Sequence, residues 1–189
     1  MAPSLFELDQ YLVRRQVFKF FGAGFHVYDK NDALVAYSKQ KAFKLKEDIR
    51  VYSDESQTNE LLLIQARQII DFSAAYDMVD SSSGTKVGTA RRKGFTSMFR
   101  DSWELLDTED KPIGTLKEDS AGMAMLRRFV NLIPQTFHLD TGGGRATFKQ
   151  RFNPFIYKLS VTIPSSCTLD RRLIFGAAVL IAAIEGRQQ

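Results

Sequence analysis

The sequence is poor in the residue types that build catalytic and metal centres. It has one cysteine, Cys167, and two histidines, His26 and His138. A single cysteine excludes an internal disulfide, and there is no Cys-x-x-Cys pair for a zinc or redox site. A Gly-x-Ser-x-Gly motif and a phosphate-binding Gly-Lys-Ser/Thr motif are also absent. We therefore expect a protein that is not an enzyme and that has no metal site and no cofactor.

Proline is scarce, and no apolar run is long enough to cross a membrane. The 189 residues include 5 prolines, 44% are hydrophobic, and the net charge is +4. This composition is typical of a folded domain spanning residues 1–189, in which residues 1–10 are expected to be flexible. The first ten residues lack the basic start and apolar run of a secretory signal, so we expect a cytoplasmic protein with no transmembrane span.

Short runs of β-favouring residues, separated by turn signals, dominate the chain. Aromatic residues make up 12% of it, and 15 of its residues are phenylalanines, which favours strands. Strands are predicted at residues 11–17, 25–29, 34–38, 43–47, 49–52, 61–68, 75–79, 86–91, 103–106, 113–117, 136–139, 145–150 and 155–161. In the last of these, Phe155, Tyr157, Leu159 and Val161 alternate with polar residues, which is typical of a sheet with one face in a core.

A weak repeat marks three of the turns. The segments at 25–29, 76–80 and 103–107 each read aromatic, any residue, apolar, any residue, Asp. Each final aspartate is placed to accept hydrogen bonds from its own downstream backbone, because the next strand follows within a few residues. The repeat unit is therefore predicted to be a β-hairpin.

Two segments break the strand pattern. Residues 120–133 have Ser120 as a helix cap, one apolar face and a proline at the end, so a short amphipathic surface helix is predicted there. Leu173 to Ile184 has 12 residues with no polar side chain on any face. Such a helix is about 18 Å long, whereas a bilayer core of about 30 Å needs about 20 residues. Asp170 to Glu185 is therefore predicted to be a helix buried inside the protein.

The expected fold is mainly β: a closed antiparallel β-barrel of about twelve strands around a central hydrophobic C-terminal α-helix, plus the short amphipathic helix. The repeated hairpin, Asn153-Pro-Phe155, and Leu169-Asp-Arg-Arg-Leu173 before the apolar helix resemble the Tubby C-terminal-like superfamily. This superfamily includes phospholipid scramblases and LURP-one-related proteins, and the sequence is most similar to the latter. The resemblance implies the same barrel. It also implies phosphoinositide binding through basic residues, as in Tubby domains, or contact with membrane lipid and calcium, as in scramblases.

The acidic turns and the histidines have simpler explanations than catalysis or metal binding. The turns at 29–32 and 107–110 lack the alternating ligands, mid-loop glycine and closing glutamate of an EF-hand, so we interpret them as solvated hairpin turns. His26 and His138 are interpreted as surface or hydrogen-bonded histidines, and Cys167 as an inert thiol.

Clusters of basic residues are the candidates for binding. The candidate lipid-binding residues are Arg91, Arg92 and Lys93, then Lys44 and Lys46, and Arg127 and Arg128 on the predicted amphipathic helix. Each lysine or arginine near an acidic membrane surface contributes about 1 kcal/mol, so three together give a weak, salt-sensitive association. Arg171 and Arg172 are instead expected at a barrel mouth, where they pair with carboxylates or cover backbone carbonyls.

We therefore expect a non-enzymatic binding module, peripheral at the membrane, that contacts anionic phospholipid or phosphoinositide through these basic residues. The alternative is a protein-interaction or scaffold protein with no lipid ligand, which a large exposed apolar patch away from the basic cluster would favour. Nucleic acid ranks third. Phe95, Phe99 and Trp103 follow the basic cluster and could stack on bases, but the same pattern is typical of barrel strands.

Overall fold

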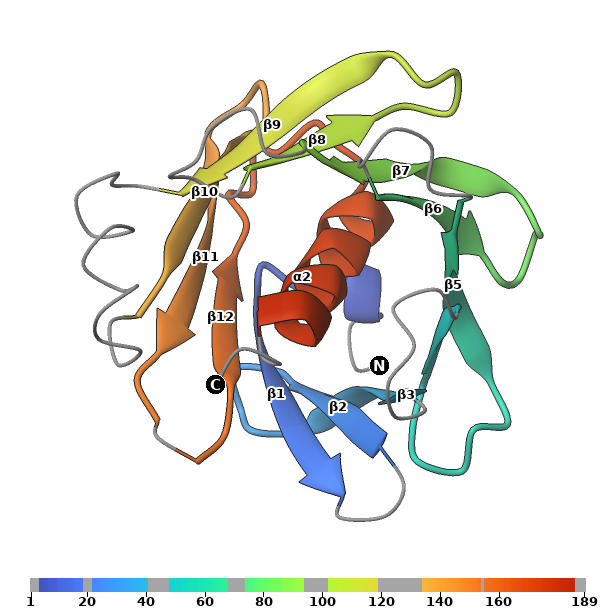
Figure 1. Ribbon diagram of the computed structural model, residues 1–189, viewed down its shortest axis with the longest axis vertical. Coiled ribbons are helices and arrows are strands. Elements are labelled where there is room, and N and C mark those ends of the chain that lie inside the picture. Colours follow the sequence, from blue (N-terminus) through green and yellow to red (C-terminus); the bar gives the residue numbers. More distant parts are fainter. Residues whose placement is uncertain are drawn as a thin grey trace.

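Twelve β-strands close into one antiparallel barrel around a helix (Figure 1). This computed structural model describes residues 4–18, 22–40, 48–67, 74–93, 102–118, 134–153 and 155–185. Each strand pairs with its neighbours in chain order, and β1 pairs with β12 to close the ring. The expected mainly-β barrel with a hydrophobic C-terminal helix is thereby confirmed.

The elements agree with the predicted strands to within three residues at each end. They are η1 (Leu5–Glu7), β1 (Gln10–Phe18), β2 (Gly22–Tyr28), β3 (Leu34–Gln40), β4 (Ile49–Tyr52), β5 (Glu60–Ala66), β6 (Ala75–Asp80), β7 (Lys86–Arg92), β8 (Ser102–Leu106), β9 (Pro112–Glu118), β10 (Thr136–Asp140), β11 (Arg145–Arg151), β12 (Lys158–Thr162) and α2 (Arg171–Glu185). The strand predicted at 43–47 and the amphipathic helix predicted at 120–133 lie outside the described residues.

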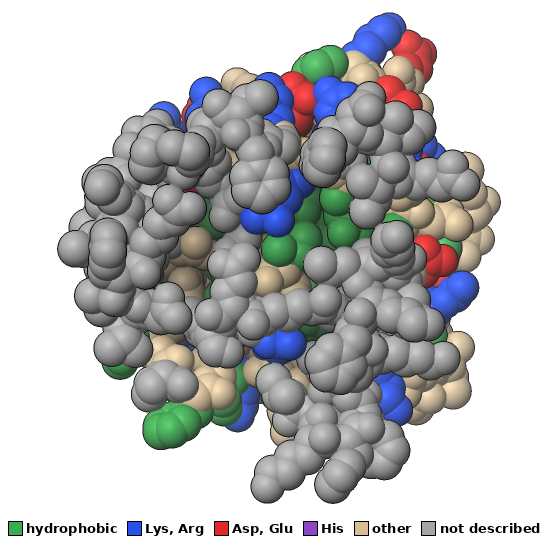
Figure 2. All heavy atoms as spheres, viewed as in Figure 1, with side chains coloured by type: hydrophobic (Ala, Val, Ile, Leu, Met, Phe, Trp, Pro, Cys, Tyr) green, Lys and Arg blue, Asp and Glu red, His purple; other side chains and the backbone are tan. Residues whose placement is uncertain are grey.

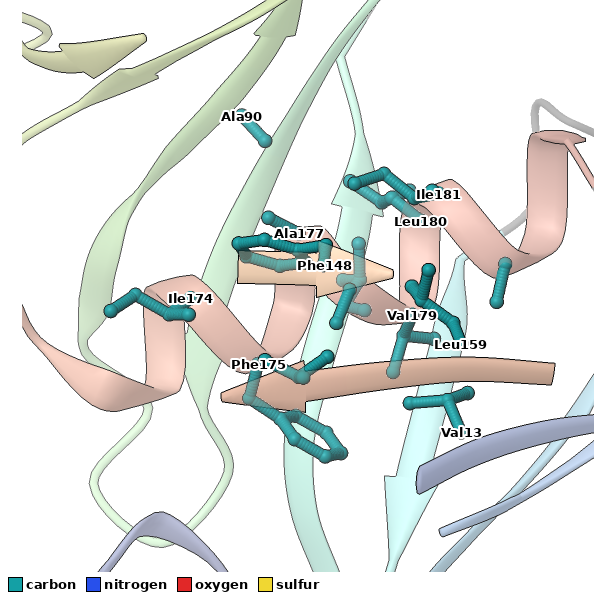
Figure 3. Packing of buried hydrophobic residues seen from close by; sticks show 14 of the residues in the cluster. Val13, Ala90, Phe148, Leu159, Ile174, Phe175, Ala177, Val179, Leu180 and Ile181 are labelled. Atoms are coloured by element: carbon teal, nitrogen blue, oxygen red, sulfur yellow. The ribbon is translucent and has the colours of Figure 1, made fainter. Parts of the chain in front are cut away.

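Helix α2 is buried on every side, as its sequence predicts. Every residue from 173 to 184 is buried, and Figure 3 shows its side chains against Val13, Phe148 and Leu159 of the barrel wall. Each fully buried large aliphatic or aromatic side chain contributes about 1.5–3 kcal/mol to stability. The inward faces of the strands and α2 therefore form a single core.

Two glycines let the helix and the wall approach closely. A Cβ atom at Gly176 of α2 would lie 2.4 Å from Met78 Sδ. A Cβ atom at Gly88 of β7 would lie 2.6 Å from the Leu106 carbonyl oxygen and 3.0 Å from Leu173 Cδ2. All three distances are shorter than ordinary van der Waals contact, so a larger residue at either position would force its neighbours to shift.

Four of the hairpins at one end of the barrel, called the tight-turn end, have an aspartate that accepts hydrogen bonds from its own downstream backbone. Oδ1 of Asp29 accepts from the backbone N–H of residues 31 and 33 at 2.8 and 2.9 Å, and Asp107 and Asp80 accept in the same way. The predicted role of the three repeated aspartates is confirmed. Asp54 is a fourth case, with the Ser56 N–H at 2.8 Å. The segment that ends at Asp54 does not match the repeat, because Arg50 occupies the position of the aromatic residue.

The start of the last strand was predicted too early. Strand β12 begins at Lys158, and Phe155 lies in the connection from β11, where its side chain is 90% exposed. Oδ1 of Asn153 accepts hydrogen bonds from the backbone N–H of Phe155 and Ile156 at 3.0 and 2.9 Å. These bonds form a turn, which competes successfully with the alternating pattern of Phe155 and Tyr157. Residues 152–153 and 155–157 are called the β11–β12 turn, and they lie at the opposite end from the tight-turn end.

Candidate functional site

The predicted basic cluster at residues 91–93 lies where β7 ends. Arg91 is opposite Glu104 of β8, and its Nη2 and Nε donate to Glu104 Oε2 at 2.5 and 3.2 Å. Lys93 Nζ lies 3.2 Å from the other oxygen of Glu104. The hydrogen bond from Arg91 is the main cause that lowers the pKa of Glu104 below its usual value. Two of the three cations therefore share one carboxylate.

Arg92 belongs to the other face of the sheet. It pairs in register with Trp103, whose side chain is buried, and consecutive residues of a strand point to opposite faces. The structure therefore brings Arg91 and Lys93 together on the outer surface and separates Arg92 from them. Lys44, Lys46, Arg127 and Arg128 lie outside the described residues, so their role in lipid binding stays a prediction.

A second group of charges surrounds the acidic turn between β8 and β9. Arg67 donates to Asp77 Oδ2 and Asp110 Oδ1, both at 2.7 Å, and Lys86 Nζ lies 2.6 Å from Asp110 Oδ1. Thr89 completes the network by donating to Asp77 at 2.6 Å. Hydrogen bonds from Arg67 and Lys86, in that order, hold the pKa of Asp110 well below its usual range. Within the described residues, no group of three or more His, Cys, Asp or Glu side chains is placed to hold a metal ion.

The two arginines that open α2 hold the helix in the barrel, as predicted. Arg171 Nη1 donates to the Leu8 carbonyl at 2.9 Å, and its Nη2 donates to Asp9 at 2.7 Å. Arg172 bridges Asp80 and Asp170 at 2.7 and 2.6 Å. The pKa of Asp80 is lowered first by the hydroxyl of Ser82 and then by Arg172. Because their donors are already engaged, these arginines are structural.

The histidines are hydrogen-bonded, as predicted. His26 is buried, with Nε2 2.6 Å from Glu55 Oε1 and its ring beside the rings of Tyr28 and Tyr37. His138 Nδ1 lies 3.2 Å from the Thr147 hydroxyl oxygen. A histidine next to one carboxylate and two tyrosine rings does not make a nucleophile–base–carboxylate triad.

Closure of the barrel brings Arg14 next to basic residues that are distant from it in the sequence. Arg14 of β1 pairs in register with Lys158 of β12, which pairs with Arg151 of β11. Lys149 lies two residues before Arg151, on the same outward face. Arg14, Lys149, Arg151 and Lys158 are called the basic face. Among the residues that the structure describes, none of the four forms an ion pair.

One signal for this face was visible in the sequence. Lys149 and Arg151 have the spacing of two that places side chains on one side of a strand. Arg14 is more than a hundred residues away, and only the pairing of the first strand with the last brings it to the same surface.

The fold places the chain among barrel proteins built around a hydrophobic helix. It belongs to the LURP-one-related family, whose sequence profile matches residues 34–182. The crystal structure of a protein from Arabidopsis thaliana has a similar fold, with a TM-score of 0.51 and 14% sequence identity over 97% of this chain and 95% of that one. Among curated proteins, none matches the chain significantly. The family relationship expected from the sequence is confirmed.

The length and hydropathy of the helices decide whether any of them could cross a membrane. In the part of the chain that the structure describes, no helix is both long and apolar enough to cross a bilayer.

Proposed function

We propose that this protein is a non-enzymatic binding module that contacts anionic phospholipid at a membrane surface through outward-facing basic residues. The observation that carries the proposal is that two neighbouring cations of β7 and its end share one carboxylate, which leaves a net positive charge at this site. Arg91 and Lys93 share the single carboxylate of Glu104. Because β7 and β11 both run away from the tight-turn end, the 91–93 cluster and the β11–β12 turn belong to the same end of the barrel.

The strength of such contact follows from counting charges. Each lysine or arginine near an anionic surface contributes about 1 kcal/mol. Glu104 offsets part of the attraction of Arg91 and Lys93, so this pair alone gives weak binding that salt screens. Membership of the LURP-one-related family, and the resemblance to the phosphoinositide-binding Tubby domains, support the choice of lipid as the ligand.

Co-sedimentation with vesicles tests the proposal. We expect pelleting with vesicles that contain phosphatidylserine or a phosphoinositide, weaker pelleting as salt is raised, and none with phosphatidylcholine alone. Lys93→Gln should weaken the binding. Lys111→Gln is the matched control, because Lys111 is an exposed lysine at the tight-turn end that pairs with Glu109 at 2.5 Å. Absence of pelleting with every anionic composition at low salt would overturn the proposal.

A protein partner is the second candidate function. It is favoured by Phe155 and Phe152, whose side chains are 90% and 59% exposed. Large apolar side chains in water mark interaction sites for proteins as well as for membranes. Under this hypothesis vesicle binding is absent or independent of lipid charge, so the same co-sedimentation series separates the two functions.

A further inference from the structure

Two phenylalanines project into solvent from the β11–β12 turn. Phe155 is 90% exposed and Phe152 is 59% exposed, whereas the other exposed large apolar residues of the described chain, Leu34 and Ile113, are 38% and 37% exposed. A phenylalanine side chain gains free energy when it leaves water. Phe152 and Phe155, called the aromatic tip, therefore expose apolar surface to water.

Three hydrogen bonds hold the described backbone of this turn after residue 154. Oδ1 of Asn153 holds the N–H groups of Phe155 and Ile156 at 3.0 and 2.9 Å. The Arg15 N–H donates to the Tyr157 carbonyl at 2.9 Å, which ties the turn to β1. Tyr157 itself is buried. These contacts hold the described backbone that carries Phe155, and pre-formed backbone lowers the entropic cost of association.

The basic face begins where the aromatic tip ends. Arg151 immediately precedes Phe152, and Lys158 follows Tyr157. Neighbouring strands are about 4.8 Å apart, so the register of Arg14, Lys158 and Arg151 places three cations side by side. In Figure 2, hydrophobic side chains protrude at the lower left, over the ends of β11 and β12 in Figure 1, with Lys and Arg atoms close by.

This combination selects one kind of partner. Adjacent like charges on neighbouring strands repel each other, and none of the ion pairs in the described part of the chain joins a carboxylate to the basic face. A partner must therefore bring negative charge to the basic face and an apolar medium to the phenylalanines. An anionic bilayer has both, because its phosphate groups lie in a plane directly above the acyl chains.

We propose that the β11–β12 turn and the basic face are the membrane-docking surface of this protein. Phe152 and Phe155 insert among the headgroups of an anionic bilayer, and Arg14, Lys149, Arg151 and Lys158 contact the lipid phosphates around them. This inference rests on the proposed function and adds to it the surface that binds and the way it binds.

Substitutions in the two parts of the surface test this inference by co-sedimentation. On phosphatidylcholine vesicles that contain phosphatidylserine, Phe155→Ala should lower the partition coefficient about tenfold. Arg151→Gln should lower it about fivefold, which corresponds to the ~1 kcal/mol of one cation near an anionic surface. Both side chains are exposed, so the variants should keep the fold, which the emission of the buried Trp103 checks.

Matched controls come from the tight-turn end. Arg145→Gln removes an exposed arginine from the other end of β11, where its Nε is 3.2 Å from Asp140. Ile113→Ala shortens an exposed apolar side chain of β9. Both variants should bind vesicles within about twofold of the unmodified protein, because neither residue reaches a bilayer that covers the β11–β12 turn.

Insertion itself has a spectroscopic signature. The Phe155→Trp variant places a tryptophan at the tip, and its emission should shift to shorter wavelength with anionic vesicles and stay unchanged with phosphatidylcholine alone. An unshifted emission in the presence of bound vesicles would overturn insertion.

The outcomes distinguish this inference from the proposed function. If the unmodified protein binds no anionic vesicle, both are wrong. If it binds and Phe155→Ala and Arg151→Gln bind equally well, the docking surface is wrong and the proposed function stands on another surface. If the two variants lose binding to a single-stranded oligonucleotide but not to vesicles, the surface is a nucleic-acid site and the inference is overturned.

Discussion

A single methyl group added to α2 tests how tightly the helix fits the barrel. In Gly176→Ala the new Cβ atom would lie 2.4 Å from Met78 Sδ and 2.9 Å from Met78 Cε. Favourable contacts between such atoms are about 3.5–4.0 Å. Met78 is 0% exposed, so its side chain has no solvent to move into. The methionine or the helix must therefore shift.

Two opposing effects determine the magnitude. Overpacking a core costs about 1–3 kcal/mol, whereas replacing a helical glycine with alanine stabilises the helix by about 1 kcal/mol. The adaptable methionine keeps the strain below the top of that range, at about 2 kcal/mol, so Gly176→Ala should lower the free energy of unfolding by about 1 kcal/mol. Met78→Ala alone leaves a cavity and should cost about 2–5 kcal/mol. In that background Gly176→Ala should become stabilising by about 1 kcal/mol, because the new methyl group fills vacated space.

Urea unfolding of the four proteins measures this reversal. Trp103 is the one tryptophan of the sequence and is 1% exposed, so its fluorescence reports on the barrel core. The two substitutions should be coupled by about 2 kcal/mol in a double-mutant cycle. If Gly176→Ala had the same effect with and without Met78, the two side chains would not compete for one space, and the packing argument would be refuted.

Three further predictions concern the core, a buried carboxylate and the turns. Ala178→Asp places an unpaired charge where the side chain is 0% exposed, so folding should be abolished, and a soluble variant with cooperative unfolding would contradict the buried helix. The pKa of Asp80 is lower in the folded chain than in the unfolded chain, so its carboxylate stabilises the fold above about pH 4 and this contribution is lost as the pH falls. In urea titrations, the free energy of unfolding of the Asp80→Asn variant should therefore fall less between about pH 6 and about pH 3 than that of the unmodified protein. Asp32 and Asp110 both have a left-handed backbone, with φ of 60° and 65°. Asp32→Gly should raise the free energy of unfolding by about 0.5 kcal/mol, because glycine adopts a left-handed backbone more easily. Asp110→Gly should lower it by about 1 kcal/mol, because two cations lose their partner. Equal effects of the two substitutions would contradict this explanation.

Local signals explain why so much of the barrel is predictable. Alternation along a strand and an aspartate at a turn depend on residues close in the sequence, so the strands and three of the four aspartate turns follow from pattern alone. The apolar helix follows from length and composition. The predicted start of β12 is wrong because Asn153 accepts a hydrogen bond from the backbone of Phe155 and so forms a turn. A turn and a strand can have the same alternation of apolar and polar residues.

The candidate sites were harder to predict because they depend on pairing across strands. Glu104, which binds two cations of the basic cluster, is more than ten residues from Arg91 and joins it through the register of β7 and β8. Arg14 meets Lys158 through the pair that closes the barrel. Neither contact can be predicted from spacing in the sequence, so the charge clusters on the surface overlap only in part with the charge clusters in the chain.

The position of α2 after all twelve strands has a consequence for how the chain acquires its structure. During synthesis, the strands leave the ribosome before the segment that fills their interior. Until residues 173–184 emerge, the inward apolar faces of the strands lack the helix as a packing partner, and β1 cannot pair with β12 until β12 has been synthesised. Contacts between such distant parts of a chain form slowly. The nascent barrel should therefore depend on chaperones, and it should be more prone to aggregation when translation stalls before α2 than after it.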